Sequence, residues 1–389
     1  MTVLSRIREV SVVRRGNRSD WILLATMLAL SAIGLVMILS ATRATGTFSM
    51  ERQMIFVAAG LIIFLVFSNI DYREYRSMIP VISGVIMVLL VVVFFFAPVS
   101  DSGVGRAHRW IPLGFFNLQP SEFAKVAVII ALASLLAPST RDDELQATVT
   151  WRKVGLAVLI TIVPGILIYR QPDLGTALVF GFVLLVLLFA AGATWRQMLT
   201  LATGSVVSVA LVWRMRLLSE YQMERLTCLV NPESDPLDQC YQLGQSIRAI
   251  GSGQIFGKGM FQENTLTHFE YVPEQQTDFI FTAVGEQLGL FGGLVVLGLF
   301  AILIWRLLVI SANSRDRFGA LIAVGIAAMI MFHVFVNVGM TIGIMPITGL
   351  PLPFLSQGGS FYMAMSLALG IANSVWLMRT PVPSENQLI

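Results

Sequence analysis

Long runs of apolar residues, interrupted by short polar segments, follow one another along almost the whole chain. An α-helix needs about 20 residues to cross the hydrocarbon core of a bilayer, and most of these runs approach that length. The one long polar interval, residues 218–275, separates the seventh run from the eighth. The pattern therefore predicts an all-α polytopic membrane protein with about ten transmembrane helices, forming a single domain over residues 1–389. We place the spans at residues 21–41, 53–69, 78–97, 121–137, 154–169, 174–191, 198–217, 288–309, 318–340 and 355–378.

The composition supports this class. Hydrophobic residues make up 56% of the 389 residues and charged residues only 13%, whereas an ordinary soluble domain carries about 25% charged residues. A water-soluble fold of this length could not bury so much apolar surface. The composition therefore excludes an ordinary soluble protein.

Basic residues near the ends of the spans predict the orientation, because Lys and Arg are retained in the cytoplasm. A basic segment precedes the first span, which lacks a small-residue cleavage site and is expected to remain as a helix. With an even number of spans, both termini are then cytoplasmic and residues 218–275 form a large extracytoplasmic loop. The net charge of +3 reflects this bias and gives no argument for binding nucleic acid. Basic residues expected on the inside include Arg6, Arg8, Arg14, Arg73, Arg76, Arg152, Arg315 and Arg317.

Both cysteines of the chain, Cys228 and Cys240, fall in the predicted outer loop. Outside the cytoplasmic membrane a thiol pair can oxidise and stay oxidised. We therefore predict a disulfide that closes a loop around Asn231, Pro232 and Pro236, with two unpaired thiols as the alternative.

Ionisable residues at the edge of a membrane span are costly and are therefore candidates for function. Glu122 and Lys125 lie three residues apart at the start of the fourth span, on one helical face where they can pair. Just before them, Arg109 and Trp110 combine a cation with an aromatic ring suited to the headgroup interface. Because Arg and Lys bind phosphate oxygens well, this corner fits a lipid-linked pyrophosphate. A structural ion pair is the alternative for Glu122 and Lys125.

Further polar residues lie at or between the predicted spans. Asp173, in the turn between the fifth and sixth spans, is positioned to cap the sixth helix. His333, Asn337 and Thr341 recur every four residues in the ninth span and predict a polar stripe that hydrogen-bonds other helices or faces a cavity. The sequence has no His and Cys cluster with metal-ligand spacing and no phosphate-binding glycine loop followed by Lys and Ser, which argues against nucleotide hydrolysis.

The long outer loop ends in a segment rich in candidate chemistry. Pro273 followed by Thr277 indicates a helix start, which would put Asp278 in the first helical turn. Asp278 is then either a stabilising cap residue or a general base at the water interface. Glu286, two helical turns further on, is a candidate second carboxylate. Glycines within residues 251–259 would let the loop backbone approach a large polar headgroup.

Several short motifs occur in order along the chain: WI at 110–111, QPSEFAK at 119–125, QPDLGT at 171–176, NPESDP at 231–236, GSGQIFGKG at 251–259, PEQQTDFIF at 273–281, GLPLP at 349–353 and SQGGS at 356–360. Together they resemble the SEDS family of cell-wall polymerases over nearly the full length of the chain. The segments NPESDP and GKG favour the elongation branch of that family over its division branch. In two respects the chain departs from the family: Gln357 stands where Tyr is common, and the cysteine pair is not a general family feature.

The resemblance implies a peptidoglycan glycosyltransferase that polymerises lipid II, an undecaprenyl-pyrophosphate disaccharide-pentapeptide, at the outer face of the bacterial cytoplasmic membrane. Asp278 matches the essential aspartate of the family. Its implied role is to take the proton from the 4-hydroxyl of the acceptor sugar as that oxygen attacks the anomeric carbon of the donor. Such a single displacement inverts the sugar linkage.

The resemblance also implies binding residues and a partner. Arg109, Lys125 or Lys258 is expected to compensate the charge of the departing pyrophosphate, with a divalent cation, Mg²⁺ or Mn²⁺, as an alternative source. Trp110 and Glu122 fall in segments that the family marks as important, and Glu122 is expected to orient Lys125. The implied partner is a class B penicillin-binding protein, a transpeptidase whose membrane helix docks on the eighth and ninth spans.

Two other classes of function stay open. A lipid flippase or transporter would also combine many spans with intramembrane polar groups, but the chain has no clear internal repeat and no matched Gly or Pro breaks in its two halves. A scaffold that only recruits the transpeptidase would leave the outer carboxylate and the basic corner unexplained. The concentration of polar residues on one outer face favours catalysis at the interface.

Overall fold

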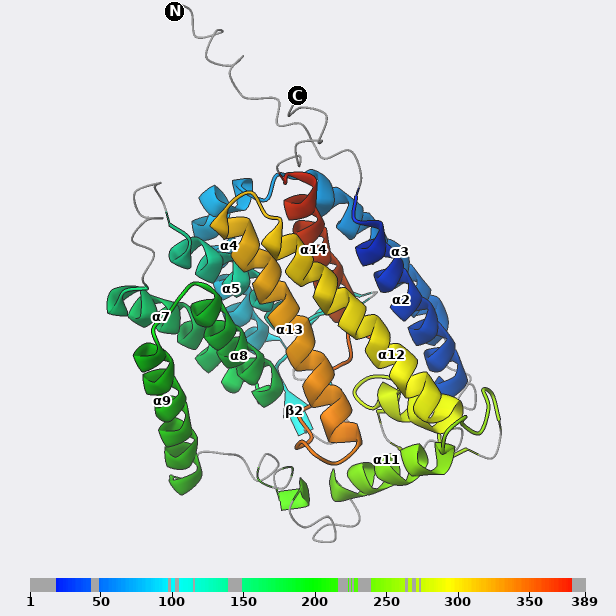
Figure 1. Ribbon diagram of the computed structural model, residues 1–389. Helices are drawn as coiled ribbons and strands as arrows, with labels where there is room; N and C mark the ends of the chain where they lie inside the picture. Colours follow the sequence, from blue (N-terminus) through cyan, green and yellow to red (C-terminus); the bar gives the residue numbers. More distant parts are fainter. Residues whose placement is uncertain are drawn as a thin grey trace, which may run out of the picture.

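The computed structural model describes residues 19–42, 49–96, 99–101, 105–114, 116–138, 149–215, 223, 225, 227–229, 239–262, 265–267, 271–272 and 274–379. Within these residues, ten helices coincide with the ten predicted spans. They are α2 (Trp21–Thr42), α3 (Ser49–Asn69), α4 (Glu74–Val92), α5 (Pro120–Leu136), α7 (Trp151–Tyr169), α8 (Leu174–Ala190), α9 (Trp195–Arg214), α12 (Ile280–Ala312), α13 (Arg317–Thr341) and α14 (Gly359–Leu377). A further helix, α11 (Gln239–Gly253), lies across one end of the bundle (Figure 1).

Most of these helices meet the requirements of a membrane span on their own. Seven of them, α2, α3, α4 with its short extension to Phe95, α7, α12, α13 and α14, are long and apolar enough to cross a membrane. Helices α5 and α8 have 17 residues each. The chain is thus a polytopic α-helical membrane protein, and the fold class predicted from its sequence is confirmed.

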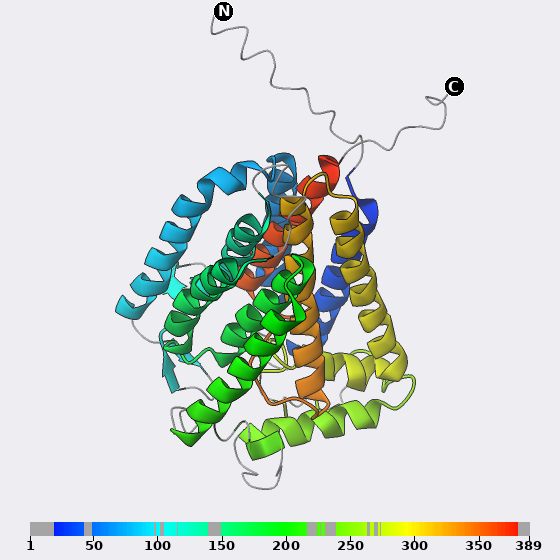
Figure 2. The same ribbon diagram turned by 60° about the vertical axis from the view of Figure 1, so that its left-hand side comes forward.

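Helices α13 and α14 form the centre of the bundle. In their most apolar stretches 72% and 78% of the residues are buried, against 17% in α3 and 11% in α4. Helices α3 and α4 instead expose large apolar side chains, such as Ile62 and Val81, which suits contact with lipid tails. Figures 1 and 2 show α13 running through the middle of the bundle, with α9 at its edge.

The described chain begins and ends at the same end of the bundle, which we call the terminal end (Figure 1). The backbone N–H of Asp20 donates to the side-chain oxygen of Asn373 at 3.0 Å, and the Asp20 carboxylate pairs with Arg306 at the end of α12. The backbone N–H of Tyr72, between α3 and α4, donates to Ser374 at 3.2 Å. These buried contacts join the start of α2 to α12 and α14, and the connection between α3 and α4 to α14.

The opposite end, which we call the hairpin end, carries two short antiparallel hairpins between α4 and α5. Strand β1 (Val99–Asp101) pairs with β2 (Gly105–Ala107), and β3 (Ile111–Pro112) pairs with β4 (Asn117–Leu118). Helix α11 lies at the same end and packs on α12 and α13.

The predicted disulfide between Cys228 and Cys240 is confirmed. Their Cα atoms lie 5.1 Å apart, and both residues are buried. The bond fastens the start of α11 to the preceding segment. The residues that the disulfide was expected to enclose, 231–236, lie outside the described part of the chain.

Several predicted span boundaries are wrong, among them the starts of α3 and α4, which come four residues earlier than predicted, and the starts of α12 and α14. Helix α12 begins at Ile280 and not at residue 288, because the chain is already helical before a break at Gly289, whose φ and ψ are 67° and −163°. The apolar run that signals the span starts only after this break. Helix α14 begins at Gly359 and not at residue 355, since the glycine pair of the SQGGS motif ends an irregular loop.

The glycine-rich loop 254–259 fills the break in α12. A broken helix must satisfy its backbone groups inside the protein, because lipid offers no partners. A Cβ atom on Gly257, whose φ is 79°, would lie 2.1 Å from the carbonyl oxygen of Gln287. Gly257 therefore serves close packing against α12, which corrects our expectation that this glycine approaches a headgroup. For Gly251 and Gly259 the expectation stays a prediction. Four backbone hydrogen bonds of 2.9 to 3.1 Å join loop and break, from Lys258 to Glu286, Gly259 to Gln287, Leu290 to Gln254 and Phe291 to Ile255.

Candidate active site

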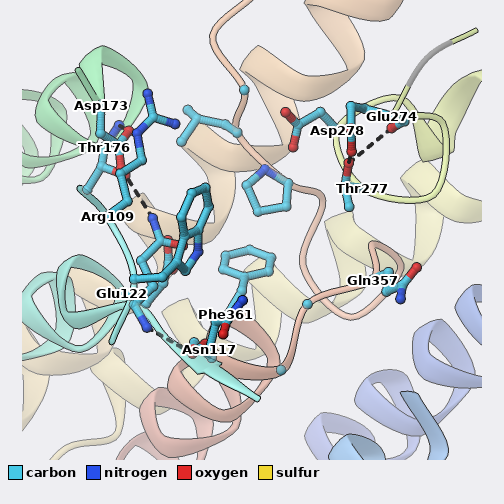
Figure 3. Close-up of a pocket in the computed structure, with 18 of the residues that line it drawn as sticks. Arg109, Asn117, Glu122, Asp173, Thr176, Glu274, Thr277, Asp278, Gln357 and Phe361 are labelled. Atoms are coloured by element: carbon cyan, nitrogen blue, oxygen red, sulfur yellow. Dashed lines mark hydrogen bonds between the residues drawn. The ribbon is translucent and has the colours of Figure 1, made fainter. Parts of the chain in front are cut away.

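A cavity of about 520 Å³ opens at the hairpin end of the bundle (Figure 3). Its wall combines segments far apart in the sequence: the loop and strands before α5, the starts of α5 and α8, the residues before α12 and the loop before α14. The charged side chains in this wall are three arginines and four carboxylates, namely Arg52, Arg109, Arg225, Glu122, Asp173, Glu274 and Asp278.

Asp278 lies directly before α12 and not in its first turn as predicted, because the helix begins at Ile280 with Phe279 as the N-cap. The carboxylate of Asp278 points into the cavity from the side opposite Arg109 and Asp173 (Figure 3). A Cβ atom on Gly349 would lie 3.2 Å from Oδ2 of Asp278 and 3.5 Å from Nη1 of Arg225. The carboxylate and this guanidinium thus face the same point of the cavity wall, where the positive φ of Gly349, 71°, favours glycine.

Glu122 and Lys125 form a buried ion pair at the cavity wall. The Lys125 Nζ atom lies 2.6 Å from Oε2 of Glu122 and 3.1 Å from Nε2 of His333, and its ammonium sits 5.2 Å from the ring centre of Phe361. Because an ammonium group only donates hydrogen bonds, Nε2 of His333 is the acceptor. Glu122 lines the cavity, whereas Lys125 does not. Lys125 therefore lies behind two residues of the cavity wall, Glu122 and Phe361, and its direct contact with a phosphate stays a prediction.

Of the polar stripe of α13, His333 bonds Lys125 of another helix, α5, whereas the further bonds of His333 and Asn337 go to loops. His333 Nδ1 lies 3.0 Å from the carbonyl oxygen of Pro351, to which it donates. The side-chain amide of Asn337 donates to the carbonyl oxygens of Asp278 and Leu350, both at 2.7 Å. The hydroxyl of Thr341 instead donates to the carbonyl oxygen of Val338 within its own helix, so the expectation for this residue is wrong.

Arg109 holds the hairpin segment against the turn before α8. Its Nε atom donates to the carbonyl oxygen of Gln171 at 2.8 Å, and its Nη2 atom donates to that of Pro172. Arg109 is half-buried and lines the cavity together with Trp110. The structure thus brings both residues to the cavity that also contains Asp278.

Asp173 caps α8, as predicted from the sequence. Its Oδ1 atom accepts from the backbone N–H of Thr176 at 3.0 Å, and its Oδ2 atom accepts from the side chain of Gln119 at 3.4 Å (Figure 3). On the neighbouring wall, the Ser360 hydroxyl donates to the carbonyl oxygen of Asn117 at 2.7 Å. These bonds connect the starts of α5, α8 and α14.

Lys258 and Glu286 lie outside the cavity wall. Glu286 has no exposed surface. Its Oε1 atom is 2.8 Å from Nζ of Lys258, and its two oxygens accept from the backbone N–H groups of Leu266 and Thr267 at 2.8 Å each. Glu286 therefore fixes the loop before α12, and its suggested role as a second catalytic carboxylate finds no support in this geometry. The predicted contact of Lys258 with substrate also stays a prediction.

Sequence reasoning missed two of the arginines that line the cavity. Arg52 stands at the start of α3 on the predicted outer side, so the rule that selected Arg109 could also have selected it. Arg225 lies in the long outer loop, where no periodicity or motif singled it out. Gln357, the departure from the common family motif, also lines the cavity, and its backbone N–H donates to the carbonyl oxygen of Gln276 at 2.8 Å.

A divalent cation was an alternative source of charge compensation. Among the described residues, no three His, Cys, Asp or Glu side chains lie close enough together to hold a metal ion. Of the four carboxylates in the cavity wall, Glu122 is paired with Lys125 and Asp173 caps a helix. The described residues thus do not form a metal site by themselves, and we derive no step through a metal.

Comparison with known proteins gives concordant matches. The family described as "Cell cycle protein", which groups FtsW, RodA and SpoVE proteins, matches residues 20–380. The peptidoglycan glycosyltransferase MrdB of Escherichia coli is 37% identical over 326 residues, which cover 84% of this chain and 85% of that protein.

Solved structures agree with this match. A chain from work on the structural coordination of polymerization and crosslinking by a peptidoglycan synthase complex superposes with a TM-score of 0.75 at 29% identity, covering 92% of this chain and 98% of that chain. The rod shape determining protein RodA of Thermus thermophilus superposes with a TM-score of 0.68 at 28% identity, covering 94% and 99% of the two chains.

Proposed function

Because the chain belongs to the FtsW, RodA and SpoVE family, also called the SEDS family, we propose that it is a peptidoglycan glycosyltransferase that polymerises lipid II at the outer face of the bacterial cytoplasmic membrane. The observation that carries this proposal is the cavity at the hairpin end. It has a volume of about 520 Å³, and its wall contains the Asp278 carboxylate together with three arginines. Its position at one end of a membrane bundle suits a substrate with a polar head and a lipid tail.

In the proposed reaction, Asp278 acts as the general base. Its carboxylate accepts the proton of the 4-hydroxyl of the acceptor sugar while that oxygen forms a bond to the anomeric carbon of the donor. The bond between that carbon and the pyrophosphate oxygen breaks, and the lipid pyrophosphate leaves with the bonding electrons. General-base catalysis of this kind contributes about 10²- to 10⁴-fold to a rate. Attack from the side opposite the leaving group inverts the linkage.

The departing pyrophosphate gains negative charge, which the arginines of the cavity wall are suited to compensate. Guanidinium groups bind phosphate oxygens through two parallel N–H donors, and such donors stabilise charge best when they are held in advance. Arg109 is held by two backbone carbonyl groups, and Arg52 and Arg225 line the same cavity. We assign these three arginines to the pyrophosphate, and Trp110 to the apolar surface beside it.

Glu122 and Lys125 act as positioning residues in this proposal. Their buried pair is connected through His333 to the carbonyl oxygen of Pro351 in the loop before α14. That loop also lines the cavity. The pair therefore supports the shape of the wall and does not contact the reacting atoms.

We also propose a role in cell elongation together with a class B penicillin-binding protein. The NPESDP and GKG segments support the elongation branch of the family. The similarity to a chain from a peptidoglycan synthase complex that couples polymerization to crosslinking supports a transpeptidase partner.

The proposal is tested by reconstituting the purified protein in liposomes with lipid II, with and without the transpeptidase, and measuring glycan chains on gels. Wild type is expected to form polymer, and Asp278→Asn is expected to form none. Glu274→Gln is the matched control: this carboxylate lines the same cavity but accepts from Thr277 at 3.0 Å, so most activity should remain.

Two results would overturn the proposal. Transfer of lipid II between leaflets without any polymer, even with the transpeptidase present, would identify a flippase. Equal polymer formation by wild type and a folded Asp278→Asn protein would remove Asp278 from the chemistry.

A further inference from the structure

A second cavity, of about 150 Å³, lies at the terminal end of the bundle, far from the candidate active site. It forms where the start of α4, the residues after α5 and the start of α13 meet, and Figure 1 shows α13 beginning at this end. We call it the arginine pocket. Its lining residues are Arg73, Arg76, Pro138, Asp316, Arg317 and Phe318.

Asp316 is the only acidic residue among the described residues that line the arginine pocket, and both of its oxygens are engaged. Oδ1 accepts from the backbone N–H of Gly319 at 2.8 Å and so caps α13. Oδ2 accepts from the hydroxyl of Tyr72 at 2.8 Å and lies 3.3 Å from Nε of Arg73. Burial raises the pKa of Tyr72 to about 12, so its hydroxyl remains a donor near neutral pH. Asp316 is thus committed to a helix cap, a tyrosine and one arginine.

The arginines keep positive charge that Asp316 does not balance. Among the described residues, the buried Nη2 atom of Arg73 finds no hydrogen-bond partner. The guanidinium of Arg76 lies 5.7 Å from the ring centre of Phe318, which holds it beside the pocket by a cation–π contact. Arg317 is exposed at the rim. Three guanidinium groups against one carboxylate leave the lining with an excess of two positive charges.

Among the described residues, the other acidic side chains near Arg73, Asp71 and Glu74, do not line the arginine pocket. Asp71 accepts from the backbone N–H of Arg73 at 3.0 Å and so serves the turn before α4. Glu74 is exposed and does not line the pocket. A buried donor without a partner, inside a concave and positively charged lining, indicates an anion of small size.

We propose that the arginine pocket binds the phosphate group of an acidic phospholipid in the leaflet at the terminal end. Its volume equals that of about five water molecules at roughly 30 Å³ each, which suits one phosphate group with a few waters. The pocket lies at the ends of membrane helices, where headgroups are found, and basic pockets between such helices bind anionic headgroups. The sequence-based orientation makes this leaflet the cytoplasmic one. A lipid bound there would join α4 to α13, the helix whose other end holds the backbone of Asp278.

The test is native mass spectrometry of the full-length protein in detergent, titrated with phosphatidylglycerol or phosphatidylcholine. Wild type is expected to bind phosphatidylglycerol preferentially. Arg76→Gln and Arg317→Gln are each expected to weaken this binding about fivefold, as for one basic residue at an anionic surface. Arg315→Gln is the matched control, since Arg315 is exposed in the same connection but does not line the pocket, and its affinity should stay unchanged.

Several outcomes would contradict the proposal. These are equal binding of the two lipids, unchanged affinity in both pocket variants, or an equal loss in Arg315→Gln, which would indicate attraction by surface charge alone. A titration with inorganic phosphate in the absence of acidic lipid distinguishes a lipid headgroup from a soluble anion. If inorganic phosphate protects the protein against thermal unfolding as well as phosphatidylglycerol does, the pocket binds a soluble anion instead. If Arg76→Gln fails to fold, the exposed Arg317 still provides the test. Glycan polymerisation does not enter any of these measurements.

Discussion

The side-chain amide of Asn337 donates a hydrogen bond of 2.7 Å to the backbone carbonyl oxygen of Asp278. The same amide nitrogen donates to the carbonyl oxygen of Leu350, also at 2.7 Å. Asn337 has no exposed surface and belongs to the central helix α13. The backbone of the proposed general base is therefore positioned by a residue of α13 that does not line the cavity.

Replacing Asn337 by Ala is expected to slow glycan polymerisation by roughly 10- to 100-fold, because a small displacement of a catalytic group has effects of this size. The substitution should also lower the melting temperature, since each buried carbonyl left without its donor costs about 1–3 kcal/mol. Steady-state kinetics should show a lower kcat with KM little changed. Asn313→Ala is the control, because the Asn313 amide donates to its own helix at an exposed position and its loss should leave both quantities unchanged.

The buried pair of Glu122 and Lys125 gives a second prediction. Lys125→Met leaves the Glu122 carboxylate without its partner, and breaking a buried pair in this way costs about 3–5 kcal/mol. The double variant Glu122→Gln with Lys125→Met removes both charges and should recover much of that loss. Thermal unfolding of the single and double variants measures the difference. If the double variant is no more stable than Lys125→Met alone, Lys125 does not stabilise the protein through its ion pair with Glu122.

Glycine at position 257 should be essential for folding. Gly257→Ala would set a Cβ atom 2.1 Å from a backbone oxygen at a positive φ, so we expect little monodisperse protein after detergent extraction. Gly251→Ala is the control, since no atom lies within 4 Å of its Cβ position in α11, and Ala is favoured over Gly in a helix by about 1 kcal/mol. Size-exclusion chromatography would compare the two, and a normal yield of Gly257→Ala would contradict the packing of loop 254–259 on α12.

Some features of the fold can be predicted from the sequence and others cannot. The ten spans could be predicted because each one is a continuous apolar stretch of the sequence. The break in α12 could not, since its partners in loop 254–259 are reached only through tertiary backbone hydrogen bonds. In the same way, Glu122 and Lys125 are recognisable as a pair at three-residue spacing, but His333 joins them from 208 residues away.

The candidate site shows the same division. A family motif pointed to Asp278 and the basic stretch before α5 pointed to Arg109, and the fold brings both residues to one cavity. Residues that reach the cavity from loops without periodicity, such as Arg225, left no signal in the sequence. Lys258 lies in the GKG motif, but its ammonium group is paired with the fully buried carboxylate of Glu286. No local sequence pattern identifies Glu286 as its partner.

The disulfide between Cys228 and Cys240 should stabilise the protein measurably. The two residues are 12 positions apart, and a crosslink over a loop of about 15 residues contributes about 3 kcal/mol in the chain-entropy picture. Reduction should therefore lower the melting temperature of wild type. A Cys228→Ser, Cys240→Ser double variant should melt at the reduced value and not respond to reductant. If reduction leaves the melting temperature of wild type unchanged, the assignment of this disulfide is contradicted.

The most direct test of the proposed chemistry measures binding and turnover of lipid II on one preparation of Asp278→Asn. If Asp278 accepts the proton, the variant should bind lipid II with an affinity within about threefold of wild type, while the rate of polymerisation falls by about 10²- to 10⁴-fold. Turnover that persists at the wild-type rate in the folded variant would contradict the account, and so would a loss of activity explained entirely by lost binding.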